Sequence, residues 1–354
     1  MRNNPEKVKK GLQKRLYLIL FLLTSSVLAL LCARLSVAFS GGLDAYIGAP
    51  LRSAISRVYG SAPFSVTEAL VIASPFIIAL IFVYAFRAAA SFGRAVRFLL
   101  SLILALCAAC SVYLFSFGIA YSKAPFYEGD YEPADINEAE LYEAAMLLSQ
   151  ELSELSPLLD GAHPPSVSEL EAELGEAASS MVAGYDGRVR LKLFSTSLFP
   201  SLGIRGLYFP LTAEVSLCAD MPLYNIPFTA AHELSHYLGV AREGEASFFA
   251  FLLCRSSQDP YIRYSGALSA YEYLAADLYR ASPELYFKVL DTLPRRARLD
   301  MAADREYRKK YEDNSAAVSF FDGVRDAHLA FSGSGGEMSY SYVTGLIVAC
   351  LGKR

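Results

Sequence analysis

Several residue types and patterns are scarce in this sequence. It has no tryptophan, only four histidines in 354 residues, and a formal net charge of −4. Beyond its first fifteen positions it has no run of more than three basic residues, and acidic residues outnumber basic ones. Proteins that bind nucleic acid present such basic patches to the phosphate backbone. We therefore expect no nucleic acid among the partners of this chain.

Cysteine chemistry is also limited. Six cysteines are present, but they do not form the two Cys-x-x-Cys pairs of a zinc ribbon. Three of them lie in apolar runs, where packed thiols are the simplest interpretation. The remaining three, Cys218, Cys254 and Cys350, are an odd number; one disulfide among them is possible, but the sequence predicts no disulfide framework.

Long apolar runs, by contrast, fill the first third of the chain. They lie at about 17–38, 66–86 and 98–120. A hydrocarbon core of about 30 Å needs roughly 20 such residues in a helix. The first run is longer than the apolar core of a signal peptide, so we expect it to be retained. The sequence therefore predicts a membrane anchor over residues 1–121 with three transmembrane helices, followed by a second domain over residues 122–354.

The basic residues predict the orientation of this anchor. Six of them lie in the first fifteen positions, and three arginines lie between the second and third runs. The loop 39–65 has only Arg52 and Arg57. Because basic residues flank membrane spans mainly on the cytoplasmic side, the N-terminus is expected in the cytoplasm. The C-terminal domain is then extracytoplasmic, in a multi-pass protein of the cell membrane with the lipid bilayer as a partner.

The C-terminal domain has a mostly helical pattern with a small β component. Apolar positions recur at helical spacing over 136–155 and 166–183, whereas 187–194 alternates as a strand does. Residues 206–220 are a second strand candidate, in which Pro210 restricts part of the segment to an edge or a bulge. Further helices are expected at about 262–279, 282–292, 300–329 and 338–351. The fold class expected is a mostly α (α+β) domain with a small sheet, in which the short terminal helix packs on the domain.

The run "AHELSH" at residues 231–236 holds two of the four histidines. In a helix that starts near Asn225 as its N-cap and stops at Gly239, His232 and His236 lie on one face, one turn apart. Both imidazoles can then bind one Zn²⁺ ion, while Glu233 is rotated by about 100° from His232. Zinc lowers the pKa of a bound water, and Glu233 can act as the general base that takes its proton. This pattern is typical of metallopeptidases.

A catalytic zinc needs a third protein ligand. Glu243 and Glu245 are the candidates, and on one helix they point about 200° apart, so only one can bind. Glu243 opens the pattern Glu243-x-x-Ala246-Ser247, which resembles the Glu-x-x-Ala-Asp or Glu-x-x-Ala-Asn of membrane gluzincins, where the first Glu binds the metal. We favour Glu243 and keep Glu245 as the alternative, for which an ion pair with Arg242 is the competing interpretation.

Three further residues are candidates for supporting roles. Ser247 is placed to contact a ligand histidine, as second-sphere residues do. Tyr340 and His328 are candidates for stabilising an oxyanion.

Four runs of the sequence together resemble domain-of-unknown-function family 3810: "GIRGLYFPLTAE", "IPFTAAHELSH", "AREGEASFFAFLLC" and "YIRYSGALSAYEYL". The resemblance implies a three-span bacterial membrane protein with a gluzincin-like, zincin-type peptidase domain. It also implies a site at His232, Glu233, His236 and the glutamates at 243 and 245.

Two functions follow from these observations. The first is a membrane-anchored zinc metallopeptidase that hydrolyses peptide bonds of a peptide or protein substrate on the extracytoplasmic side. The alternative is a non-catalytic, zinc-stabilised membrane sensor or scaffold. Glu233 favours the first, because a purely structural zinc site has no need of a base between its ligands.

Overall fold

The structure is a computed structural model that describes residues 5–127, 131, 136–188, 190–312, 323 and 340–352. By their contacts, the residues group into two units. The first consists of Met1–Ala62, Val66–Ala124 and Phe209–Ala213. The second consists of Pro63–Ser65, Pro125–Tyr208 and Glu214–Arg354.

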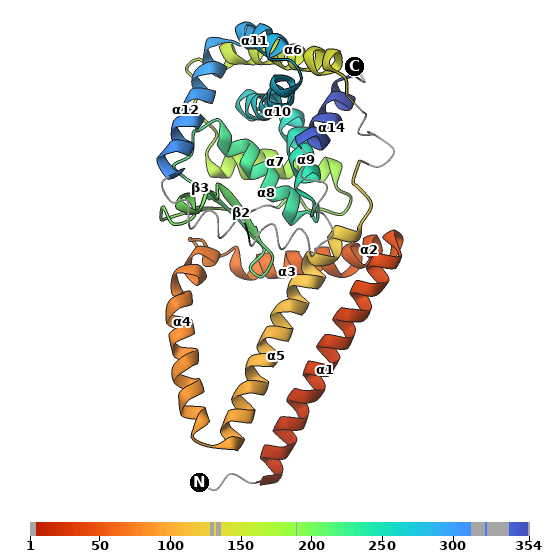
Figure 1. Ribbon diagram of the computed structural model, residues 1–354, viewed down its shortest axis with the longest axis vertical. Helices are drawn as coiled ribbons and strands as arrows, with labels where there is room; N and C mark the ends of the chain where they lie inside the picture. The colour runs from red at the N-terminus through yellow and green to blue at the C-terminus, as the bar shows by residue number, and fades with distance from the viewer. Residues whose placement is uncertain are drawn as a thin grey trace. The chain divides into compact units, whose positions relative to one another are not determined.

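The first unit contains three helices that are long and apolar enough to cross a membrane. They are α1 (Pro5–Leu35, with the span at Lys9–Leu35), α4 (Val66–Ala89) and α5 (Phe92–Ser116). Helix α5 packs against both α1 and α4 (Figure 1). Most of their large apolar side chains are exposed, which suits helices surrounded by lipid. The three predicted apolar helices are thus confirmed.

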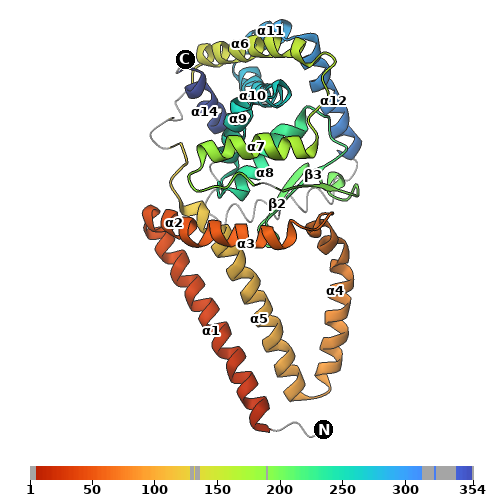
Figure 2. The ribbon, with the colours of Figure 1, turned by 180° about the vertical axis from the view of Figure 1, so that it is seen from behind.

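All three helices differ from the expected bounds at one end or both. Helix α1 stops at Leu35 because Ser36 caps a new helix, its Oγ accepting a hydrogen bond from the Phe39 N–H at 3.2 Å. Helix α5 ends at Ser116, since Phe117 leaves the helical conformation with φ −149°. Between α1 and α4 lie α2 (Val37–Leu43), the π-helical turn η1 (Asp44–Gly48) and α3 (Ala49–Tyr59). They run across the direction of the long helices (Figures 1 and 2). A 3-10 turn, η2 (Gly118–Ser122), follows α5.

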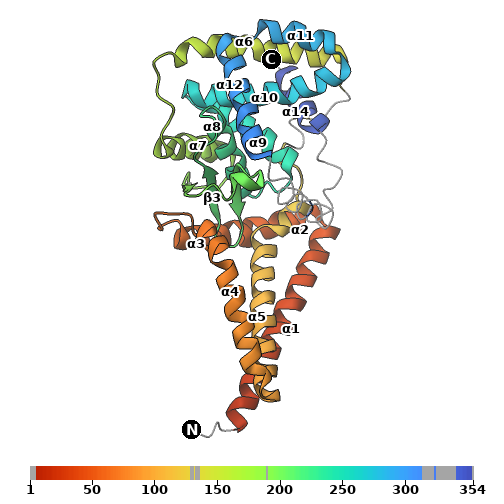
Figure 3. The same ribbon diagram turned by 60° about the vertical axis from the view of Figure 1, so that its left-hand side comes forward.

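The second unit is built around helix α10 (Pro260–Ala281). Packed against it are α6 (Glu138–Leu155), α8 (Asn225–Tyr237), α9 (Glu243–Ser256), α11 (Pro283–Thr292) and α14 (Tyr340–Gly352). Helices α6 and α11 lie side by side (Figures 1 and 3). Short α14 contacts α6, α9 and α10, so the predicted packing of the terminal helix on the domain is confirmed. The other helices in the described part of this unit are α7 (Val167–Met181) and α12 (Arg295–Glu312), with 3-10 turns η3 (Ser156–Leu159) and η4 (Pro200–Leu202).

Apolar side chains from α6, α9, α10, α11, α12 and α14 form the core of the second unit. The fully buried members include Leu148, Leu152, Phe248, Phe251, Tyr271 and Leu346. At roughly 25 cal/mol per Å² of apolar surface, their burial stabilises the fold that carries the site.

A three-stranded sheet with the order β1-β3-β2 lies in the described part of this unit. Strand β1 (Leu191–Phe194) pairs in parallel with β3 (Glu214–Cys218), whose residues are all buried. The segment expected as one strand, 206–220, is instead β2 (Gly206–Phe209), a turn, and β3. Pro210 lacks the N–H that a strand needs, and Ala213 has φ +49°, so the chain turns between them. In the strand order β1-β3-β2, strand β2 lies at an edge of the sheet.

Candidate metal centre

Helix α8 carries the two motif histidines one turn apart. Their ring centroids are 4.8 Å apart, with the rings perpendicular. The helix starts at Asn225, but the cap residue is Tyr224. The expectation that Asn225 is the N-cap is wrong, because its side chain instead donates a hydrogen bond to Asp304 Oδ1 at 2.6 Å.

The helix ends in the tight reversal expected from Gly239. This glycine has φ +89°, and its N–H donates to the His236 carbonyl at 3.0 Å. The Val240 N–H donates to the Ser235 carbonyl at 3.0 Å. These two bonds are those of a Schellman motif. The reversal brings the chain back to α9 within a few residues, so Glu243 starts that helix beside the histidines.

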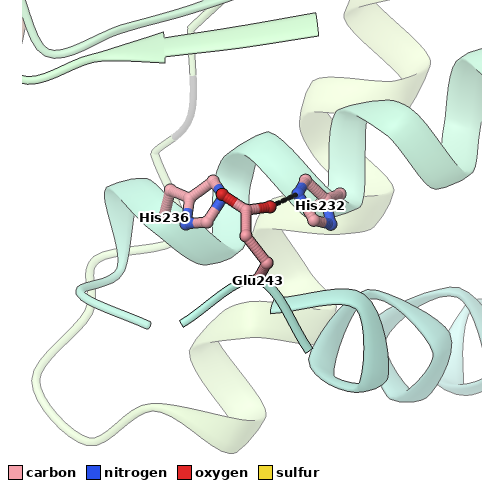
Figure 4. A group of neighbouring side chains, drawn as sticks. All are labelled: His232, His236 and Glu243. Atoms are coloured by element: carbon pink, nitrogen blue, oxygen red, sulfur yellow. Dashed lines mark hydrogen bonds and ion pairs between the residues drawn. The ribbon is translucent and has the colours of Figure 1, made fainter. Parts of the chain in front are cut away.

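The carboxylate of Glu243 faces both imidazoles (Figure 4). Its Oε2 lies 3.2 Å from Nε2 of His232, and its Oε1 lies 3.6 Å from Nε2 of His236. All the ligand atoms of this group are within 4.8 Å of one another. The side chain of Glu243 is 38% exposed, so the group is accessible from solvent.

The two separations between the Glu243 carboxylate and the imidazoles fit a tetrahedral metal ion. Two ligands at about 2.0–2.1 Å from a Zn²⁺ ion, with a tetrahedral angle between them, are about 3.3 Å apart. The two measured separations lie on either side of that value. Two imidazoles and one carboxylate also form a donor set that binds zinc. The group therefore fits a metal ion of this kind.

Each histidine is held through its other ring nitrogen. Nδ1 of His236 donates to the Val240 carbonyl at 2.8 Å. Nδ1 of His232 is hydrogen-bonded to Ser247 Oγ at 3.3 Å, and the Tyr273 hydroxyl donates to that Oγ at 3.1 Å. A hydrogen bond at Nδ1 fixes the ring and leaves Nε2 for a metal. The predicted contact between Ser247 and a histidine of the motif is thus present.

The charges in the group reinforce one another in the metal-free protein. Burial alone would lower the pKa of His236, but the Glu243 carboxylate outweighs it and raises this pKa to about 9. Burial also opposes ionisation of Glu243, yet His236 and His232 hold its pKa well below the usual range. The group is therefore an ion pair that a metal would replace.

Glu233 lies beside this group but points elsewhere. Its carboxylate is buried, and Oε2 accepts a hydrogen bond from the Tyr208 N–H of β2 at 2.7 Å. Burial raises the pKa of Glu233, with the two histidines opposing the shift. Gly206 makes this close approach feasible: a Cβ there would lie 2.8 Å from Glu233 Cγ and 2.7 Å from Thr229 Cγ2.

The other predicted residues fall outside the group. Glu245 is buried and forms an ion pair with Arg242, which is the competing interpretation given for it. His328 and the side chain of Tyr340 lie outside the described residues. Sequence reasoning missed Tyr208, Gly206 and Tyr273, because their roles depend on how β2 and α10 pack against the motif helix.

Asp304 of α12 links the two elements that frame the site. Its Oδ1 accepts from the Asn225 amide and from Arg205 Nη2 at 2.8 Å, and its Oδ2 accepts from Arg308 Nε at 2.7 Å. Arg205 directly precedes β2, and Asn225 begins α8. A carboxylate that is 2% exposed therefore fixes the start of both the edge strand and the motif helix.

Comparison with known proteins gives one match. A family model with the description "Protein of unknown function (DUF3810)" matches residues 45–348. No curated protein and no solved structure matches the chain.

Proposed function

The chain belongs to the DUF3810 family, and we propose that it is a membrane-anchored zinc metallopeptidase with a gluzincin-like, zincin-type domain. One observation carries the proposal. The Glu243 carboxylate faces both histidines of the motif helix, while the motif's own glutamate, Glu233, is kept out of that group and buried beside it. A metallopeptidase needs this separation, because one acid binds the metal and another moves protons.

His232, His236 and Glu243 would hold the Zn²⁺ ion. When bound, zinc polarises a carbonyl and makes a water molecule more acidic at neutral pH. The hydrogen bonds from His236 to Val240 and from His232 to Ser247 keep both imidazoles oriented for this task. The donor set leaves a fourth tetrahedral position for substrate or water.

Glu233 would be the general base. Burial raises its pKa, which makes its carboxylate a stronger base for taking a proton from water and returning it to the leaving amine. The hydrogen bond from Tyr208 holds one carboxylate oxygen, Oε2. Backbone groups of an edge strand such as β2 can align an extended peptide, which favours a peptide or protein substrate.

We propose that the site lies on the extracytoplasmic side of the membrane. This orientation is supported by the six basic residues that precede or begin the first span and by the three arginines in 87–97, where the second span ends and the third begins. A reporter enzyme active only outside the cytoplasm, fused after residue 354, is expected to be active. Activity of a cytoplasm-only reporter at the same position would reverse the orientation.

The test of function uses the full-length protein in lipid nanodiscs with a random peptide library, with cleavage read by mass spectrometry. The wild type is expected to cleave peptides in the presence of zinc. Glu233→Gln is expected to keep its zinc and lose cleavage, whereas the exposed-residue control Glu284→Gln keeps both. Equal cleavage by wild type and Glu233→Gln would refute the proposal. A wild type that holds zinc without cleaving would favour the zinc-stabilised sensor or scaffold.

A further inference from the structure

The helical segment between the first two membrane spans has few surface charges. It comprises α2, η1 and α3, and its two flanks join α1 after Leu35 and α4 before Val66. Because one span ends and the next begins there, the segment is joined at both ends to helices that meet the same membrane surface. Its helices run across the direction of those spans (Figures 1 and 2).

Two of the three charged residues in 36–65 are removed from the surface. Nη1 of Arg52 contacts Asp44 Oδ1 at 2.6 Å, and their side chains are 2% and 7% exposed. The same Nη1 donates to the Ser116 carbonyl at 2.7 Å, at the end of α5. Lys123 provides a second cation to Asp44. The ionic group thus ties α3 to the end of a span and leaves Arg57 as the exposed charge of this segment.

Apart from Arg57, the exposed face of η1 and α3 is apolar. Tyr46 is 85% exposed, Ile47 43% and Val58 68%. Pro50 and Ala54 are exposed as well. Positions 46, 47, 50, 54 and 58 have the spacing of one helix face. A surface helix in water normally exposes its polar side. The exposed side of this segment is apolar instead, as expected for a face that contacts lipid or protein.

We propose that residues 37–59 form an interfacial helical segment whose apolar face lies in the lipid of the bilayer surface. Helices of this type lie in the membrane plane, with the apolar face about 5–10 Å into the boundary between headgroups and acyl chains. The partner is lipid because the segment is joined at both ends to membrane spans. It therefore stays at the membrane surface at which those spans end. Arg57, next to Val58, is placed to reach lipid phosphates.

The segment would set the depth of the anchor. Arg52 holds the last turn of α5 through the Ser116 carbonyl, so α3 in the interface fixes where that span ends. This inference concerns the first unit alone and does not depend on the chemistry proposed for the metal centre.

The absence of tryptophan from the chain gives a direct test. Tyr46→Trp and Val58→Trp each introduce a single fluorophore at an exposed position of the segment. Two controls bracket them: Phe76→Trp, at the middle of α4 and 72% exposed, and Tyr279→Trp, on α10 and 52% exposed. Each full-length variant is placed in nanodiscs, with bromine-labelled phosphatidylcholine as the lipid quencher and acrylamide as the aqueous quencher.

The two segment variants are expected to lose most of their emission to lipid brominated near the headgroup end of its chains. Phe76→Trp is expected to respond more to lipid brominated near the chain ends, and Tyr279→Trp to acrylamide alone. If Tyr46→Trp and Val58→Trp behaved like Tyr279→Trp, the segment would lie in water and the inference would be wrong. Protection from both quenchers would place a protein surface there instead and would equally overturn it.

Discussion

The Tyr208 N–H donates a hydrogen bond to Glu233 Oε2 at 2.7 Å, and this bond joins the edge strand β2 to the motif helix α8. Glu233 is thereby held beside the three candidate ligands without joining them. The geometry gives separate roles to two acids of the same site.

Gly206→Ala is expected to disturb Glu233 and leave the metal in place. A Cβ at this position would come within 2.9 Å of Thr229 Cγ2, Glu233 Cγ and Glu233 Oε1. Such overpacking costs about 1–3 kcal/mol, so we expect a lower unfolding midpoint and reduced peptide cleavage at unchanged zinc content. Gly352→Ala is the control, because nothing lies within 4 Å of the corresponding point. Unchanged cleavage and unchanged stability in Gly206→Ala would contradict the close packing of β2 on Glu233.

Ser247→Ala is expected to weaken zinc binding. Ser247 joins His232 Nδ1 to the Tyr273 hydroxyl, and loss of a residue that orients a metal ligand lowers metal affinity by about 10-fold or more. Competition with a chelator of known affinity measures the change. Ser256→Ala is the matched control on the same helix, since its Oγ bonds only within the helix to the Leu253 carbonyl. Equal affinity in the two variants would remove Ser247 from the support of His232.

Zinc binding at neutral pH is expected to release a proton from His236. In the metal-free protein burial lowers the pKa of this imidazole, but Glu243 raises it to about 9, so the ring is protonated at pH 7. A metal binds the neutral ring and displaces that proton. The proton released from His236 should disappear as the pH rises through about 9. Titration calorimetry in buffers of different ionisation enthalpy counts the protons, and a count that stays constant from pH 7 to pH 10 would contradict this ion pair.

Asp304→Asn is expected to destabilise the second unit. The substitution removes a buried charge that binds Arg205 and Arg308, and hydrogen bonds to charged groups contribute about 1.5–3 kcal/mol each. Because both arginines are partly exposed, we expect a net loss of only about 2 kcal/mol, seen as a lower midpoint of thermal unfolding. Glu284→Gln, which removes an exposed helix pair with Lys288, should change it little. A midpoint unaffected by Asp304→Asn would show that this link does not hold β2 and α8.

Much of the fold was predictable because its signals are local. Apolar runs of about twenty residues indicate membrane helices wherever they occur, and the three were confirmed. Helix bounds were predicted less accurately. Ser36 starts a new helix through its side-chain cap, and Phe117 ends α5 through its backbone conformation. Segment 206–220 was expected as a single strand with an edge or bulge at Pro210, whereas the chain turns after Phe209 and forms two strands.

The candidate site was also predictable only where its signals are local. The position of His232 and His236 on one helix face follows from helix geometry. The Gly239 reversal then places Glu243 near them. The choice between Glu243 and Glu245 could not be made from helix geometry alone, since it depends on how α9 starts and on the ion pair between Arg242 and Glu245. Tyr208 and Tyr273 contact the site through tertiary packing, for which a single sequence has no periodic signal.

The most direct test of the account is the metal content of the purified protein, measured by mass spectrometry for the wild type, His236→Ala, Glu243→Gln and Glu245→Gln. The account predicts zinc in the wild type and in Glu245→Gln, and its loss from His236→Ala and Glu243→Gln. Zinc retained by Glu243→Gln but lost from Glu245→Gln would contradict the assignment of the third ligand. A wild type without zinc, under conditions in which a known zinc enzyme keeps its metal, would contradict the metal centre itself.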